Sequence, residues 1–233
     1  MTNPRQALLS VLMTTKMSES KKPNDLREAC IAEAMAIIAT DGVESLSLRD
    51  VARRLGVSHQ APYKHFPSRD HILAEIVTRA YADFARHLDQ HAKSDNPDQD
   101  MAQMGRAYLE YANGHPLEYR LMFGTPLPAE HDHPEMMREA KHAFGLLCDA
   151  LRRRPTTDQH IRSDDEIMLD ALFVWSGLHG LASITSSSAI ASLGIADHLL
   201  HASHARLLQG FGQALGVTAA GQAPPLPQEH HEP

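Results

Sequence analysis

Residues 47–66 contain side chains whose chemistry suits the edges of DNA bases. His59, Gln60 and Ala61 follow a glycine-containing turn within this segment. Glutamine can form two hydrogen bonds with adenine, histidine can donate to or accept from purine edges, and the alanine methyl can touch a thymine methyl. At the start of a helix, these three residues would be presented to the major groove of DNA.

Groups suited to phosphate oxygens surround these three residues. Tyr63, Lys64 and Arg69 offer a phenol, an ammonium and a guanidinium at the rim of the segment. Ser47 adds the free N–H groups of a helix start, which bind anions. Arg49 is placed similarly, but it could instead pair with a neighbouring acid.

A first short helix must lead into this segment. Ser47 and Asp50 resemble a capping box, with the shorter aspartate replacing the usual glutamate. Gly56 ends the helix and supplies the positive φ that a tight turn needs. The predicted buried face of this helix consists of Leu48, Val51, Ala52 and Leu55.

A second short helix is expected from Ser58, its N-cap, to about His65. Pro62 is tolerated because it lies in the first turn, where backbone N–H groups lack partners within the helix. The two helices and the turn between them predict a helix-turn-helix, the arrangement that carries base-contacting side chains into the major groove.

Longer helices flank this pair. Asp25 and Glu28 form a predicted capping box ahead of an apolar stripe that stops at Gly42. Ser68 caps a long helix whose inner face extends to Leu88. The rest of the chain also shows helical spacing and no alternating strand pattern, so the fold class is expected to be all-α, with about nine helices.

The distribution of charge favours the same interpretation. The formal net charge of the chain is −7, which is unusual for a DNA-binding protein. Between residues 49 and 69, however, a single acid, Asp50, stands among five basic residues. These basic residues are Arg49, Arg53, Arg54, Lys64 and Arg69. We therefore expect a basic surface on an otherwise acidic molecule.

At these residues the chain resembles the tetracycline-repressor-type (TetR-type) transcriptional regulators. The likeness runs over about residues 26–84 and is carried by an ordered set of motifs. These are Gly42, Ser-Leu-Arg-Asp-Val-Ala at 47–52, Leu-Gly-Val-Ser at 55–58, Ala-Pro-Tyr-Lys-His-Phe at 61–66 and Arg-Asp-His-Ile-Leu at 69–73. The resemblance implies an all-helical homodimer that binds palindromic double-stranded operator DNA, usually as a repressor, and is released by a small effector.

The C-terminal part resembles a subgroup of this family with a Trp-x-x-x-His-Gly signature, here Trp175 to Gly180. Apolar and aromatic residues from several predicted helices could line an effector pocket with a few polar groups. Each could equally belong to the core of the domain. The candidate ligand-binding residues are Met104, Tyr108, Met122, Phe123, Phe144, Trp175 and His179, with Met101, Leu147 and Leu178 beside them.

The last two long helices carry more apolar surface than one face needs, which indicates a four-helix dimer interface. The residues that indicate it are Ala171, Val174, Leu178 and Leu181, then Leu199, Leu200, Leu207, Leu208 and Phe211. Two-fold symmetry would place two recognition elements about one DNA turn apart.

The expected organisation has five parts. They are a flexible N-terminal extension at 1–23, a helix-turn-helix DNA-binding domain at 24–68, a connecting helix at 69–92, a helical effector-binding and dimerisation domain at 93–216, and a disordered tail at 217–233. The N-terminal extension could instead be an arm that touches DNA through its lysines. Cys30 and Cys148 have no metal spacing and are expected to be buried thiols.

Histidines support an alternative, a metal-responsive regulator. The chain has 16 histidines, and His198, His201 and His204 recur every third residue in the last helix. Such spacing can bind a transition metal, but no cysteine or second cluster joins them, so a solvated or interface face is favoured. We assign no metal site and no cofactor.

A helical enzyme and a structural adaptor are the remaining alternatives. No phosphate-binding glycine loop or nucleophile elbow occurs, and no carboxylates are paired at a helical spacing that points into one site, so we assign no catalytic residue. Base-suited side chains argue against the adaptor. No apolar run reaches the length of a membrane span and no secretory signal is present, so we expect a soluble cytoplasmic protein with no membrane partner.

Overall fold

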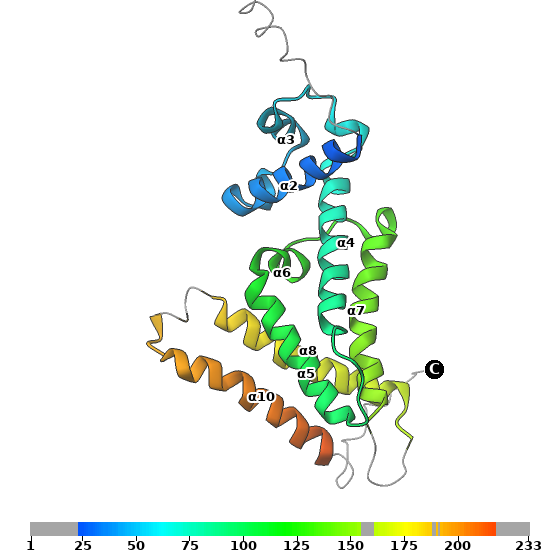
Figure 1. Ribbon diagram of the computed structural model, residues 1–233, viewed down its shortest axis with the longest axis vertical. Helices are drawn as coiled ribbons and strands as arrows, with labels where there is room; N and C mark the ends of the chain where they lie inside the picture. The colour runs from blue at the N-terminus through cyan, green and yellow to red at the C-terminus, as the bar shows by residue number, and fades with distance from the viewer. Residues whose placement is uncertain (1–22, 155–160, 188–189, 191, 218–233) are drawn as a thin grey trace, which may run out of the picture. The chain divides into compact units, whose positions relative to one another are not determined.

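The computed structural model describes residues 23–154, 161–187, 190 and 192–217, and this part of the chain is helical and contains no strand (Figure 1). Pro23 and Val217, at the edges of the predicted N-terminal extension and tail, belong to helices, and the rest of both predicted segments lies outside the described residues. The chain forms two compact units that divide between Ile72 and Leu73.

The described part of the first unit contains α2 (Pro23–Asp41), η1 (Val43–Ser45), α3 (Leu48–Leu55) and η2 (Pro62–Lys64), of which η1 and η2 are short 3₁₀ helices, and it ends in the first residues of α4 (Arg69–Leu88). Apolar residues of α2 and α3 form its core, among them Cys30, Ile37 and Val51, which are at most 1% exposed. We had expected Asp25 at the N-cap of this helix. The α2 helix begins at Pro23, however, so Asp25 lies in its first turn.

Two glycines shape the first unit as predicted. Gly42, with φ of 85°, follows α2, and Gly56, with φ of 66°, caps the C-terminus of α3 in the left-handed region. A residue with a Cβ is strained at such angles. At the other end of α3, the Ser47 hydroxyl accepts from the Asp50 amide at 3.1 Å and donates to the Asp50 carboxylate at 2.9 Å. In a full capping box the backbone N–H of the N-cap residue also donates to the carboxylate, and here the Ser47 hydroxyl donates to that carboxylate instead.

The second helix of the predicted pair differs from expectation. Residues 59–61 form turns, and only Pro62–Lys64 is helical, of the 3₁₀ type. Pro62 has no N–H to bond the Ser58 carbonyl four residues earlier, and the Ala61 amide takes that carbonyl instead, at 2.9 Å. A hydrogen bond between residues three apart is typical of a 3₁₀ helix, which is tighter than an α-helix. We had expected an α-helix that tolerates Pro62, but the proline favours the 3₁₀ form instead.

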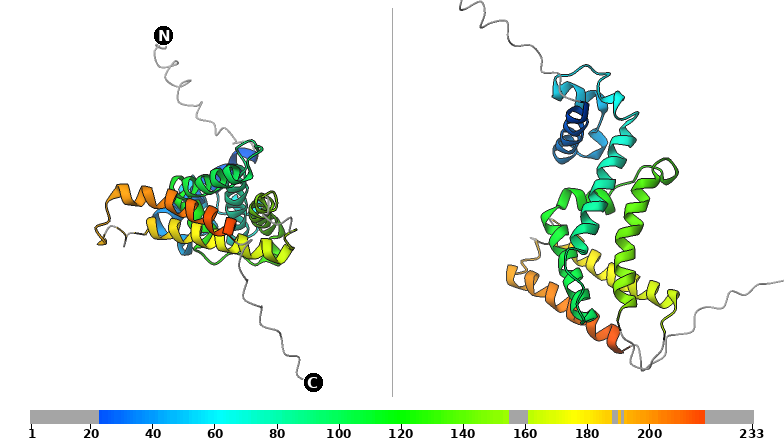
Figure 2. Two further views of the ribbon diagram at one scale, coloured as in Figure 1. Left: turned by 90° about the horizontal axis from the view of Figure 1, so that it is seen from below. Right: turned by 45° about the vertical axis from the view of Figure 1, so that its right-hand side comes forward.

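The second unit is a helical domain in which α5 (Pro97–Gly114) packs against the later turns of α4 and against four further helices. These are α6 (Pro116–Phe123), α7 (Pro134–Arg152), α8 (Asp164–Thr185) and α10 (Asp197–Val217), and a short 3₁₀ helix, η3 (Glu130–Asp132), precedes α7. The views in Figures 1 and 2 show α10 running beside α5 and α8. The α4 helix (Arg69–Leu88), in which the division of the chain falls, contributes its later turns to this unit.

Two ion pairs join the ends of α5 and α7. The Arg153 guanidinium lies 2.9 Å from the Asp100 carboxylate, and the Arg154 Nε lies 2.5 Å from the Asp98 carboxylate. The Arg154 side chain is only 7% exposed, so its charge depends on this carboxylate. The Ser94 hydroxyl and then Arg153 hold the pKa of Asp100 below its ordinary value.

The α8 helix begins with a full capping box, in which the side chains of Ser163 and Glu166 each accept from the backbone N–H of the other residue. After its acidic first turn the helix is mostly apolar, and its most apolar stretch of 18 residues has a mean hydropathy of 1.5. By length and composition it is the one helix among the described residues that could cross a membrane. This corrects the expectation that no segment is long and apolar enough. The reason is that α8 has two apolar faces.

One of these faces packs in the core through Ile167, Ala171, Val174 and Leu178, and the other is exposed. The exposed face consists of Met168, Leu169, Leu172 and Phe173, each at least 45% exposed. Ala171, Val174 and Leu178, which we had expected at a dimer interface, therefore lie in the core of the domain, since successive apolar positions on a helix can point in opposite directions.

Candidate nucleic-acid interface and candidate effector pocket

The segment that follows α3 presents polar side chains to solvent. Ser58, His59, Gln60, Tyr63 and Lys64 are all exposed. Pro62 and Phe66 are buried and anchor the segment to the first unit, and Ala61 is half-buried. The tight turns thus place the base-suited side chains and the two phosphate-suited ones on one short exposed element, as a groove-contacting element requires.

Ion pairs remove much of the positive charge that the sequence predicts here. The Arg53 guanidinium bonds the Asp50 carboxylate at 2.8 Å and, with the Ser47 hydroxyl, lowers the pKa of Asp50. Arg54 lies 2.6 Å from the Asp41 carboxylate and 3.6 Å from that of Glu33.

Arg69 also has partners within the first unit. Its guanidinium donates to the Val43 carbonyl at 2.8 Å and lies 3.3 Å from the Asp70 carboxylate. By contrast, Arg49 and Lys64 are exposed and form no ion pair with any described residue. Arg49 and Lys64 are therefore the cations most available to DNA phosphates, whereas Arg69 has a structural role as well.

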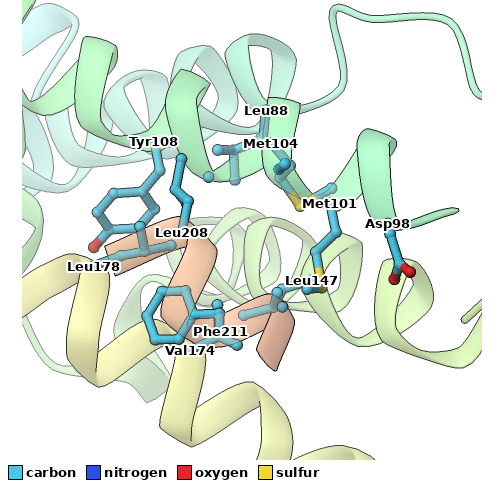
Figure 3. Close-up of a pocket in the computed structure, with 13 residues that line it drawn as sticks. Leu88, Asp98, Met101, Met104, Tyr108, Leu147, Val174, Leu178, Leu208 and Phe211 are labelled. Carbon is cyan, nitrogen blue, oxygen red and sulfur yellow. The ribbon is translucent and has the colours of Figure 1, made fainter. Parts of the chain in front are cut away.

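An apolar pocket of about 130 Å³ lies in the second unit, among α5, α7, α8, α10 and the end of α4 (Figure 3). Its two polar lining side chains are Tyr108 and Asp98. The remaining lining residues are Leu88, Met101, Ala102, Met104, Gly105, Leu147, Val174, Leu178, Leu208, Phe211 and Gly212.

Two glycines let α10 approach closely enough to form a wall of this pocket. A Cβ at Gly105 would collide with the Leu208 side chain, and a Cβ at Gly177 would collide with Phe211. Leu208 and Phe211 therefore fit against bare backbone on α5 and α8. We had expected these two α10 residues at a dimer interface, but they contact the core instead, because the glycines leave room for them.

The predicted ligand-binding residues divide into two groups. Met104 and Tyr108 line the pocket, together with the predicted neighbours Met101, Leu147 and Leu178. The other five, which do not line it, are Met122, Phe123, Phe144, Trp175 and His179.

Those five side chains lie in or beside an aromatic cluster of α4, α5, α6, α7 and α8. The Phe123 ring centroid is 6.1 Å from that of Trp175 and 5.3 Å from that of His179. Phe144 is 5.8 Å from Trp175, and Met122 is buried and accepts a hydrogen bond from the Tyr81 hydroxyl at its carbonyl. The aromatic residues among these five thus contact one another beside the pocket and do not line it.

A chain of hydrogen bonds connects the pocket to this cluster. The Tyr108 hydroxyl lies 2.8 Å from that of Tyr119, which lies 2.8 Å from Nδ1 of His179. The His179 Nε2 lies 3.4 Å from the Ser183 hydroxyl. Burial raises the pKa of Tyr108 and raises that of Tyr119 to about 12, and it lowers the pKa of His179. Burial thus favours the neutral form of all three groups.

Sequence reasoning missed the contributions of Leu88, Val174 and Gly105 to the pocket. The apolar residues follow the same helical spacing as core residues, so no local signal separates pocket from core. The paired glycines Gly105 and Gly177 were a usable signal, because glycine within a helix costs stability unless something approaches closely.

The histidines of the alternative metal hypothesis are not gathered into a site. Within the described residues, no group of three or more His, Cys, Asp or Glu side chains is arranged to hold a metal ion. His201 Nδ1 donates to the Asp197 carbonyl at 2.7 Å, one helical turn earlier. Cys30 and Cys148 are both buried thiols, as expected, and burial raises the pKa of Cys148.

Two family descriptions match the chain. Residues 31–76 match "Bacterial regulatory proteins, tetR family", and residues 101–211 match "Tetracyclin repressor-like, C-terminal domain". The first match contains the exposed segment after α3, and the second contains most of the pocket.

Named relatives and solved structures agree with these matches. The HTH-type transcriptional regulator Rv1816 of Mycobacterium tuberculosis is 27% identical over 194 residues, which cover 70% of this chain and 83% of the relative. The crystal structure of the regulatory protein SCO4313 is 25% identical, with a TM-score of 0.68, over 84% of this chain and 98% of that one. A Rhodococcus sp. RHA1 protein of unknown function, 23% identical, shares the fold over 84% and 98% of the two chains, with a TM-score of 0.62.

Proposed function

We propose that this chain, which belongs to the TetR family of helix-turn-helix transcriptional regulators and is not an enzyme, is an effector-responsive repressor. In this proposal a homodimer binds palindromic double-stranded operator DNA and releases it when a small molecule occupies the apolar pocket. The observation that carries the proposal is the exposed segment after α3, with base-suited side chains beside two cations that have no acidic partner among the described residues.

Within this proposal, base and phosphate contacts are made by different residues. His59, Gln60 and Ala61 contact base edges and determine sequence preference. Tyr63 and Lys64 contact phosphates. The remaining phosphate contacts are assigned to Ser47, Arg49, Ser58 and Arg69.

A second copy of the chain would cover the exposed apolar face of α8. Met168, Leu169, Leu172 and Phe173 form a continuous stripe on this helix. Exposed stripes of this kind are unfavourable in a monomer and typical of an interface between subunits. Two-fold symmetry then provides two DNA-contacting segments, as a palindromic operator needs. With such a partner α8 is a buried interface helix, and we place the protein in the cytoplasm.

The test of the function is a DNA-binding titration with the region upstream of the protein's own gene. We expect specific binding whose affinity falls steeply as salt rises, because phosphate contacts release counterions. A random duplex of equal length is the control. Equal affinity for both duplexes, or an affinity independent of salt, would refute the proposal that the protein is a DNA-binding regulator.

A further inference from the structure

The geometry of the pocket points to an effector of one chemical class. We propose that the pocket beneath α10 takes a compact, uncharged and mainly apolar molecule, about the size of one or two fused aromatic rings. Fatty acids and other organic anions are excluded. This inference rests on the proposed role of the pocket as the effector site.

The size of the pocket limits the ligand. Its volume of about 130 Å³ is close to that of an engineered apolar cavity of roughly 150 Å³ that holds a benzene molecule. Met101 and Met104 line it, and methionine side chains adapt to irregular shapes. A single ring therefore fits without rearrangement, and a fused pair of rings fits if the methionines move. A long acyl chain does not fit.

The charges around the pocket exclude an anion. No lysine, arginine or histidine is among the lining residues, and the one charged side chain, Asp98, is itself negative. The nearby guanidinium of Arg154 already bonds Asp98 at 2.5 Å. A ligand carboxylate would have to lose its water without gaining a cation, which is strongly unfavourable.

The same ion pair excludes an organic cation. A cationic ligand could be neutralised only by Asp98, and taking that carboxylate would leave the Arg154 guanidinium without it. Since the Arg154 side chain is almost fully buried, an unpaired charge there is costly.

Hydrogen bonding adds little to recognition of the ligand. The only other polar lining side chain is Tyr108, whose hydroxyl is already bonded to Tyr119 at 2.8 Å. Both polar groups of the lining thus have partners, and the remaining wall offers apolar contacts alone. The pocket therefore selects its ligand by shape and by the removal of apolar ligand surface from water.

Occupation of this pocket would stabilise contacts among several helices. Leu178 of α8, Leu208 of α10 and Met104 of α5 all face the cavity (Figure 3). A molecule between them replaces empty space with apolar contact on three helices at once. Binding should therefore raise the unfolding temperature of the protein.

The test compares four probes on the purified full-length protein by isothermal titration calorimetry and thermal unfolding. The probes are indole, indole-3-carboxylate, tryptamine and decanoate. We expect indole to bind and to raise the unfolding temperature. We expect each charged probe to bind at least about tenfold more weakly, a difference of about 1.4 kcal/mol. Equal or tighter binding of a charged probe, or no binding of indole, would overturn the proposal.

Two substitutions in the pocket lining and one control substitution test where the ligand binds. Met104→Trp fills the cavity and should abolish indole binding, whereas Met137→Trp makes the same change on α7, away from the lining, and should leave it intact. Leu208→Ala enlarges the cavity and should favour 1-naphthol over indole relative to the natural protein. Indole binding unchanged by both Met104→Trp and Leu208→Ala would show that the ligand lies elsewhere.

DNA binding, measured on the same preparation, separates this inference from the proposed function. Specific DNA binding without indole binding would refute the proposed ligand class but not the proposed regulator function. Indole binding without specific DNA binding would refute the proposed regulator function but not the proposed ligand class of the pocket.

Discussion

The hydroxyl of Tyr119 on α6 lies 2.8 Å from Nδ1 of His179 on α8. The same hydroxyl lies 2.8 Å from that of Tyr108 on α5, so one oxygen joins three helices. Tyr108 and Tyr119 are at most 7% exposed, and burial favours the neutral form of His179. A neutral imidazole has one donor nitrogen and one acceptor nitrogen, which suits a chain of hydroxyls on one side and the Ser183 hydroxyl on the other.

Tyr119→Phe should destabilise the second unit. The substitution removes the bridging oxygen and leaves the Tyr108 hydroxyl and the His179 Nδ1 without this partner, and each buried polar group left unbonded costs about 1–3 kcal/mol. Urea denaturation measures the change. Tyr63→Phe, at an exposed position, is the control and should leave the free energy of unfolding unchanged. Equal stability of both variants would contradict the role of the bridge.

The stability of the protein should depend on the protonation of His179. Its pKa is lowered by burial in the folded state, so the unfolded chain takes up the proton first as the pH falls. The contribution of His179 is therefore complete above its unfolded pKa of about 6.5 and is lost as the pH falls below that value.

His179→Gln tests this dependence. The variant should lose part of the decline in unfolding free energy that the natural protein shows as the pH is lowered below about 6.5. His65→Gln, at a histidine of the first unit, is the control. Parallel pH profiles for the natural protein and His179→Gln would show that His179 does not contribute.

Gln60→Ala and Lys64→Ala should weaken DNA binding in different ways. If Gln60 contacts a base, its loss should relax preference at one base pair, at a cost of about 1–3 kcal/mol for the preferred sequence. Loss of Lys64 should weaken operator and random DNA to a similar degree and reduce the salt dependence by about one counterion. A set of single-base operator variants distinguishes them, and the reverse pattern would show the two roles to be exchanged.

Arg49 and Arg54 form a matched pair of arginines on α3. Arg54 lies 2.6 Å from Asp41 and is about one-third exposed, whereas Arg49 is exposed and has no acidic partner among the described residues. Arg49→Ala should lower DNA affinity and leave the unfolding temperature unchanged. Arg54→Ala should lower the unfolding temperature by loss of its ion pairs. If the Arg49→Ala variant bound DNA with full affinity, Arg49 would not be part of the DNA-binding interface.

Leu169→Glu should convert the proposed dimer into monomers. Leu169 is 56% exposed on the apolar face of α8, and a carboxylate at the centre of a subunit interface loses its water without a partner. Leu193→Glu, at another exposed leucine outside α8, is the control. Light scattering after size-exclusion chromatography reports the mass, and a dimer that survives the Leu169 change would place the interface elsewhere.

The sequence by itself determined the elements of the DNA-contacting unit. Ser47, Gly42 and Gly56 act on neighbouring backbone, so their effect on helix starts and stops can be read locally. The 3₁₀ geometry around Pro62 was also local in origin, since it follows from one missing N–H and could have been predicted by pairing each amide with its carbonyl.

The tertiary structure alone decided which charges and apolar residues are available for binding. Arg54 meets Asp41, thirteen positions away, and Leu208 meets Gly105 across two helices. Neither contact has a signal in local spacing, because helical periodicity tells which face of a helix is apolar but not which helix covers it. For the same reason, Trp175 and His179 could be recognised from the sequence as a motif, while their place beside the pocket, rather than in its wall, depended on packing between distant helices.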